Sequence, residues 1–123
     1  MSGNKFLIDT NVIIYHLAGN SNIESLLDNA VLYISALTFA ELLSKKDLTI
    51  DEEQVVRSYI RATHIIHTND FICEMAAGIR RTKRIKLPDA IIAATCFFLD
   101  IPLVTFDSDL DNIPDLKIIK LSL

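Results

Sequence analysis

Acidic residues at four places in the chain could act together: Asp9, Glu41, Asp89 and Asp107. Carboxylates that gather within a few ångströms raise one another's pKa and destabilise a fold unless a cation neutralises them. Oxygen ligands without Cys or His favour Mg²⁺ or Mn²⁺ over Zn²⁺. Such a cation can lower the pKa of bound water and stabilise the charge that develops on a phosphodiester. The first question is therefore whether the fold brings these acids together.

The elements that must position the acids follow from hydrophobic spacing. Short apolar runs predict strands at 6–8, 31–34, 64–67, 102–105 and 117–121. Helical spacing predicts helices over 12–17, around 23–27, after Ser35 or Thr38, from about 51 to 60, over 71–79 and over 88–99. Strands that alternate with helices predict one α/β domain over residues 1–123, a three-layer fold with a central, mostly parallel sheet.

This fold predicts one shared edge for the four acids. Asp9 closes the first strand and Asp107 follows the fourth. Glu41 lies early in the helix after the second strand, and Asp89 lies in the first turn of a helix that is apolar nearly all round. Because helix N-termini and strand C-termini share a side in parallel α/β folds, all four acids should lie where such folds bind ligands.

Each acid also has a structural interpretation. Asp9 could cap the next helix, Glu41 could complete a capping box with Thr38, Asp89 suits a helix N-terminus and Asp107 suits a turn. Taken singly, Glu41 and Asp107 favour the structural interpretation. Capping does not require four acids on one edge, however, so the combination favours a metal site.

The charge balance argues against nucleic-acid binding through overall positive charge. The 123 residues carry Asp+Glu 16 against Lys+Arg 12, a net charge of -4. One local run contains five of the 12 basic residues: Arg80, Arg81, Lys83, Arg84 and Lys86. Such a run commonly complements a helix dipole at a C-terminus, and it could also supply phosphate contacts.

The hydropathy predicts a partner and no membrane span. Half of the residues are apolar and the mean hydropathy is +0.33, which is high for a soluble monomer. Residues 12–17 with Leu26 and Leu27 are a candidate partner surface, although core packing is the alternative. Cys73 and Cys96 lie in apolar helical patterns and are expected to be buried, unpaired thiols. Together with the lack of a signal-peptide pattern, they predict a cytoplasmic protein.

Several short motifs give the chain a family resemblance. They span Leu7 to Val12, Ser35 to Leu43, Lys86 to Ala94 and Leu103 to Asp107. In this order and spacing the chain resembles PIN-domain nucleases, and in length and layout it is most similar to VapC-type toxins of toxin–antitoxin pairs.

The resemblance implies a Mg²⁺- or Mn²⁺-dependent endoribonuclease, in which the four acids hold the metal and activated water attacks an RNA phosphodiester. Thr10 and Asn11 match the family's first motif, and Asn11 and Thr105 would support the site by hydrogen bonding. Asp109 is the second candidate for the fourth ligand after Asp107. The implied partners are the RNA substrate and a cognate antitoxin, and a homodimer is expected.

Three other functions are compatible with parts of the pattern. A housekeeping RNA-processing nuclease would carry the same acids, and an inactive PIN-like scaffold would be expected to lack them. A haloacid-dehalogenase-type phosphatase also begins with Asp at the end of its first strand. It requires a second Asp two residues later, where this chain has Asn11.

Overall fold

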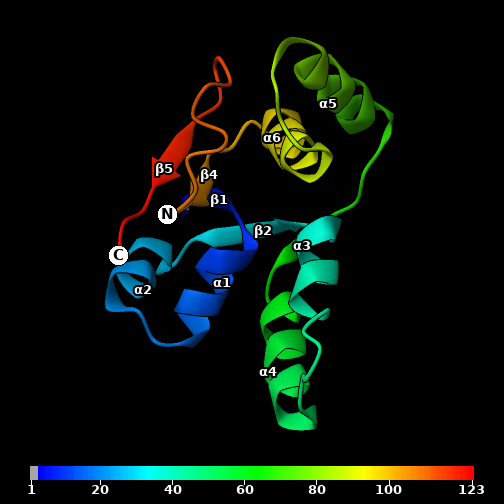
Figure 1. Ribbon diagram of the computed structural model, residues 1–123. Coiled ribbons are helices and arrows are strands. Elements are labelled where there is room, and N and C mark those ends of the chain that lie inside the picture. The colour runs from blue at the N-terminus through cyan, green and yellow to red at the C-terminus, as the bar shows by residue number, and fades with distance from the viewer. Residues whose placement is uncertain (1–2) are drawn as a thin grey trace.

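A five-stranded sheet forms the centre of the computed structural model, which describes residues 3–123 (Figure 1). Its strands are β1 (Lys5–Ile8), β2 (Val31–Ser35), β3 (His64–Ile66), β4 (Leu103–Thr105) and β5 (Ile118–Lys120). The helices are α1 (Thr10–Leu17), α2 (Ser21–Leu27), α3 (Ala36–Leu42), α4 (Ile50–Arg61), α5 (Asp70–Thr82) and α6 (Leu87–Leu99). The strand order is β3-β2-β1-β4-β5, and every neighbouring pair is parallel.

Helices cover both faces of this sheet. Alternate side chains of the central strand β1 point to opposite faces, and the apolar ones on each face are buried under helices. Leu7 packs into a core with α5 and α6, whereas Phe6 and Ile8 pack into a second core with α1 and α2. The predicted three-layer α/β fold is confirmed, and the described sheet is parallel throughout.

The helix α6 is the most buried helix of the fold. Its residues from Ala90 to Cys96 are all buried, as a helix that is apolar nearly all round should be. It packs against α5 through Ile72, Ala76 and Ile79. Small alanines on α6 let the two helices lie close together, side by side in Figure 1.

Local caps fix where the helices begin. Ser35 caps α3 by accepting a hydrogen bond from the Leu37 N–H at 3.1 Å. Thr49 and Glu52 form a reciprocal capping box at the start of α4. The alternative capping box of Thr38 with Glu41 is therefore wrong, because α3 begins at Ala36 and Thr38 lies inside it.

Two expected burials are wrong. Hydrophobic spacing over residues 51–60 predicts that Val55 shares a buried face with Val56, Tyr59 and Ile60. Val55 is instead 53% exposed, because it lies about 100° around α4 from Val56 and outside the buried stripe. Cys73 is exposed on α5, whereas Cys96 is buried, and both thiols are free. No helix within residues 3–123 is long and apolar enough to cross a membrane.

Candidate active site

The topology places a ligand crevice beside β1. From β1 the chain proceeds to β2 and β3 on one side, and later returns to β4 on the other side. Ligands in open α/β sheets bind outside the carboxyl ends of the strands at such a reversal. Asp9 directly follows β1, Asp107 follows β4, and the helix α3 that carries Glu41 follows β2.

These acids line one cavity of about 220 Å³. Its polar wall consists of Asp9, Thr10, Asn11, Thr38, Glu41, Asp89, Thr105 and Asp107, and its apolar wall includes Leu37, Ile92, Leu103 and Leu110. The structure thus brings together the four acids and the three supporting residues that the sequence singled out. Their roles stay a proposal.

Asp9 serves the fold as well as the cavity. Its Oδ1 accepts a hydrogen bond from the Val12 N–H at 3.1 Å and caps α1, and its Oδ2 accepts one from the Thr105 hydroxyl. Burial raises the pKa of Asp9, and the charges of Asp107 and Glu41 raise it further, while the two hydrogen bonds lower it. The structural and functional interpretations of Asp9 are therefore compatible.

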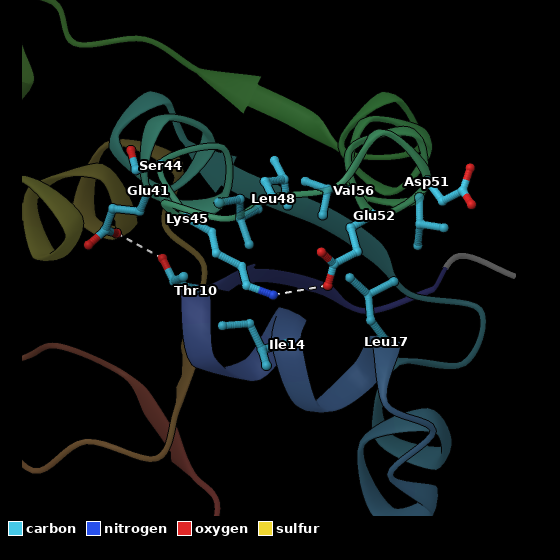
Figure 2. Close-up of a pocket in the computed structure, with 12 residues that line it drawn as sticks. Thr10, Ile14, Leu17, Glu41, Ser44, Lys45, Leu48, Asp51, Glu52 and Val56 are labelled. Carbon is cyan, nitrogen blue, oxygen red and sulfur yellow. Dashed lines mark hydrogen bonds and ion pairs between the residues drawn. The ribbon is translucent and has the colours of Figure 1, made fainter.

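Glu41 reaches the cavity from the last turn of α3, so the expectation that it lies early in this helix is wrong: α3 begins at Ala36 and ends at Leu42. Its Oε1 accepts a hydrogen bond from the Thr10 hydroxyl at 2.8 Å, which Figure 2 shows as a dashed line. Thr10 is the first residue of α1, so this bond joins the start of α1 to α3. Thr10 and Thr105 thus each orient one carboxylate.

Asp89 lies in the first turn of α6. Burial raises its pKa, and so do the negative charges of Asp109, Asp107 and Glu41, whereas Lys86 lowers it. Within residues 3–123 the Asp89 carboxylate has no side-chain hydrogen bond and no ion pair. Its environment disfavours the charged form unless a cation enters the cavity.

The turn after β4 separates its three acids. Asp107 lines the cavity, its backbone N–H donates to Thr105 Oγ1 at 3.0 Å, and its Oδ1 accepts the Asp109 N–H at 3.1 Å. Asp109 does not line the cavity, although its charge acts on Asp89. Asp111 is paired with Lys120 at 2.8 Å. Of the two candidates for the fourth ligand, Asp107 lines the cavity and Asp109 does not, and the choice between them stays a prediction.

The basic run divides between two surfaces. Arg80 and Arg81 lie in the last turn of α5 and line a separate shallow pocket with Cys73, Leu87 and other residues of α5 and α6. Lys86, at the other end of the run, is close enough to Asp89 to lower the pKa of that carboxyl group. The structure therefore places only part of the run beside the acids.

The cavity fits a divalent cation in its donor chemistry, because its carboxylates offer only oxygen and because burial raises the pKa of Asp9 and of Asp89. However, no three His, Cys, Asp or Glu side chains within residues 3–123 are grouped closely enough to hold one metal ion. Asp9 and Glu41 instead point to hydroxyl and amide donors. Binding a cation would thus require these side chains to reorient.

A larger groove adjoins the cavity and shares Thr10 and Glu41 with it. Its volume is about 730 Å³, and its apolar lining comprises Ile14, Leu17, Leu42, Leu48, Val55 and Val56. Figure 2 shows α1 on one side of the groove and α4 on the other, with Lys45 extended toward Glu52. The partner surface expected over 12–17 is exposed at Ile14, Tyr15 and Leu17, whereas Leu27 is buried in the core.

Sequence reasoning missed two features of this region. Thr38 was considered only as a cap, yet its side chain lines the acidic cavity. The groove wall from Leu42 to Val56 was also missed, because it depends on how α4 folds back beside α1. Val55, which is exposed beside the buried stripe of α4, lines this groove.

Solved structures show the same arrangement of elements. A toxin–antitoxin complex from Klebsiella pneumoniae contains a chain that is 29% identical, with a TM-score of 0.78 over 93% of this chain and 95% of that one. The FitAcB structure from Neisseria gonorrhoeae is 26% identical, with a TM-score of 0.75 over 94% and 96%. VapBC2 from Rickettsia felis, bound to a promoter DNA fragment, is 21% identical and shares the fold with a TM-score of 0.81 over 96% and 99%.

The fold and the cavity thus define an α/β protein with an acidic candidate site at the carboxyl edge of its parallel sheet. Residues 6–116 match the PIN domain family, and the chain belongs to that family. No curated protein matches the chain. The predicted resemblance to the PIN family is confirmed.

Proposed function

We propose that this PIN-domain protein is a Mg²⁺- or Mn²⁺-dependent endoribonuclease and the toxin of a toxin–antitoxin pair. The observation that carries the proposal is the convergence of Asp9, Glu41, Asp89 and Asp107, from four separate segments, on one cavity at the switch point of the sheet. The 29% identical chain in a toxin–antitoxin complex supports the biological role.

The chain's own residues would prepare this cavity for the cation and the substrate. Asp9, Glu41, Asp89 and Asp107 would hold the cation, with Asp109 as the alternative to Asp107. Bound there, a divalent cation lowers the pKa of water and neutralises charge on a phosphodiester. Thr105 and Thr10 fix Asp9 and Glu41, and Leu37, Ile92, Leu103 and Leu110 exclude bulk water from one wall.

RNA cleavage with and without Mg²⁺ or Mn²⁺ tests the proposal. Asp9→Asn and Asp89→Asn should abolish cleavage, and EDTA should abolish it in the wild type. Asp111→Asn is the matched control, because Asp111 lies in the same turn as Asp107 but pairs with Lys120 outside the cavity. Equal, EDTA-insensitive activity in all variants would falsify the metal mechanism. No activity in any preparation would favour an inactive scaffold.

The adjoining groove supports an antitoxin partner. Ile14 and Val55 are 51% and 53% exposed within it, so a partner segment with apolar side chains would bury surface that water now contacts. Because the groove shares Glu41 and Thr10 with the cavity, a bound segment would also lie across the path to the acids. This position would couple antitoxin binding to loss of nuclease activity.

A charge in the groove tests the antitoxin proposal. Ile14→Asp should weaken binding of the small protein encoded beside the toxin by roughly 10-fold or more, because it buries a carboxylate without a partner. Ile50→Asp is the control, since Ile50 is 78% exposed and outside the groove. Equal loss of affinity in both variants, measured by calorimetry, would argue against this groove.

The homodimer remains a proposal, and it is supported by an exposed apolar patch on α5 and α6. Phe71 and Phe98 are 48% and 44% exposed with ring centroids 5.6 Å apart, and Leu87 is 50% exposed. Sedimentation equilibrium of Phe98→Ser should show weaker self-association than the wild type. A monomeric wild type would remove the dimer from the proposal. A cytoplasmic location is also proposed, since both thiols are free, as in a reducing compartment.

A further inference from the structure

Thr38 carries a buried hydroxyl without a partner. The residue is 0% exposed, and its Oγ1 has no hydrogen bond to any atom of residues 3–123. A buried hydroxyl that has lost its hydrogen bonds to water destabilises a fold unless another group replaces them. Valine would fill nearly the same volume without that penalty. The hydroxyl therefore requires an explanation outside the packing of the chain.

The other buried hydroxyls within residues 3–123 all have partners. Thr95 donates to the Ile91 carbonyl one turn earlier in α6 at 2.7 Å, Thr105 donates to Asp9, and Ser35 caps α3. Thr38 cannot use the bond that satisfies Thr95. It is the third residue of α3, so the residue four positions earlier is Ile34, which lies in β2 and not in the helix.

The position of Thr38 indicates what its partner is. Three threonines line the acidic cavity: Thr10 donates to Glu41, Thr105 donates to Asp9, and Thr38 has no acceptor within the described chain. An occupant of this cavity must be attractive to carboxylates and must also offer a hydrogen-bonding atom to a neutral hydroxyl. A hydrated divalent cation meets both conditions, because its charge attracts the acids and Mg²⁺ keeps several of its waters in protein sites. A phosphate group alone would be repelled by the acids.

We propose that Thr38 is a binding residue whose hydroxyl forms a hydrogen bond with a water of the hydrated divalent cation in the acidic cavity. The inference rests on the proposed metal dependence and adds a neutral residue to the carboxylates. Removing the hydroxyl should weaken cation binding even in the absence of RNA. It should not destabilise the metal-free protein, since the hydroxyl has no partner there.

Titration of the full-length protein with Mn²⁺, followed by calorimetry without RNA, tests this inference. Thr38→Val should bind Mn²⁺ roughly 3- to 10-fold more weakly than the wild type, while the Tm of its metal-free form stays equal or rises. Thr38→Ser should keep the affinity within about 2-fold, because it keeps the hydroxyl. Thr95→Val is the matched control: it should lower the Tm, because it breaks a satisfied bond, and leave the Mn²⁺ affinity unchanged.

The outcomes separate this inference from the proposed function. Equal Mn²⁺ affinity of Thr38→Val and the wild type overturns the inference alone, and so does a loss seen only in RNA cleavage, which would place the hydroxyl on the substrate. A wild type that binds no Mn²⁺ overturns both. If Thr38→Val does not fold, Thr38→Ser and Thr38→Ala still differ only by the hydroxyl, and equal affinities of that pair overturn the inference.

Discussion

Replacing Thr105 by valine removes the two hydrogen bonds that connect Asp9 to the turn after β4. The Thr105 hydroxyl donates to Asp9 Oδ2 and accepts the Asp107 N–H at 3.0 Å, and the residue is only 2% exposed. Valine has nearly the same shape as threonine, so the substitution should leave little empty space in the core and cost little stability through packing. The change therefore measures the hydrogen bonds and not the packing.

The expected loss of stability follows from the charges involved. A hydrogen bond to a charged group contributes about 1.5–3 kcal/mol and a neutral one about 0.5–1.5 kcal/mol. Because both partners of Thr105 remain partly buried after the change, we expect Thr105→Val to lower the free energy of unfolding by about 2–4 kcal/mol at pH 7 in metal-free buffer. A domain of ordinary stability, about 5–15 kcal/mol, stays folded after this loss.

The loss should depend on pH in one direction. Burial already raises the folded-state pKa of Asp9 above its ordinary value of 3.8, and the Thr105 hydrogen bond opposes that rise. For a raised carboxyl pKa, the associated stability is fully present below 3.8 and is lost as the pH rises through the folded-state pKa. Removing Thr105 raises the pKa further, so the deficit of the variant should be largest at neutral pH and should shrink as the pH falls toward 4.

Urea unfolding followed by circular dichroism at pH 7 and pH 4 measures both quantities. Thr95→Val is the control, because Thr95 is equally buried but donates to the neutral Ile91 carbonyl. Its deficit should be about 0.5–1.5 kcal/mol and the same at both pH values. A Thr105→Val deficit that does not change with pH would refute the reasoning, because it would show that the charge of Asp9 is not stabilised by Thr105.

Three further changes test the site and its supports. Asp89→Asn should raise the Tm of the metal-free protein at pH 7 by roughly 1–3 °C, with allowance for solvent screening. The reason is that it removes a carboxylate whose pKa is raised by burial and then by Asp109. A calorimetric scan below pH 3.8 should show no rise in Tm, because the wild-type carboxyl group is then neutral. Ser35→Ala should lower the free energy of unfolding by about 1 kcal/mol through loss of the α3 cap, whereas Ser35→Asn should retain most of it in the same urea titration. Lys86→Ala should weaken RNA binding and lower its salt dependence, and Lys46→Ala, on the exposed segment before α4, should not; equal effects on the slope of log K against log salt would argue against a local contact.

Much of the fold was predictable because its signals are local. The apolar run before Asp9 forms β1, and the nearly uniform apolar pattern from Ala90 onward forms the buried helix α6. The predictions that Val55 and Cys73 are buried are wrong, because such local signals do not reveal which side of a helix a neighbouring element covers. That depends on how α4 and α5 pack, which spacing alone does not specify.

The location of the acids was also predictable, whereas their hydrogen bonds were not. Parallel topology puts Asp9 and Asp107 at one edge. Glu41 lies in the last turn of α3 and reaches the same cavity because that helix is only seven residues long. The pairing of Thr10 with Glu41 joins residues 31 positions apart, and that of Thr105 with Asp9 joins residues 96 apart. No local pattern encodes such contacts. The same limit applies to Thr38, whose T-x-x-E spacing imitates a capping box until the true cap at Ser35 is seen.

The ion pairs of the described chain leave the acids of the cavity unpaired. Within residues 3–123, four ion pairs join Lys45 to Glu52, Arg57 to Glu53, Lys117 to Asp100 and Lys120 to Asp111. None of these pairs includes an acid that lines the cavity. The hydrogen-bond partners of these acids in the described part of the chain are neutral hydroxyl and amide groups. Neutral donors orient carboxylates without cancelling their charge, so the cavity keeps its negative potential in the folded protein. A cation that enters it therefore meets carboxylates that form no ion pair within residues 3–123, with only Lys86 close enough to act on the charge of Asp89.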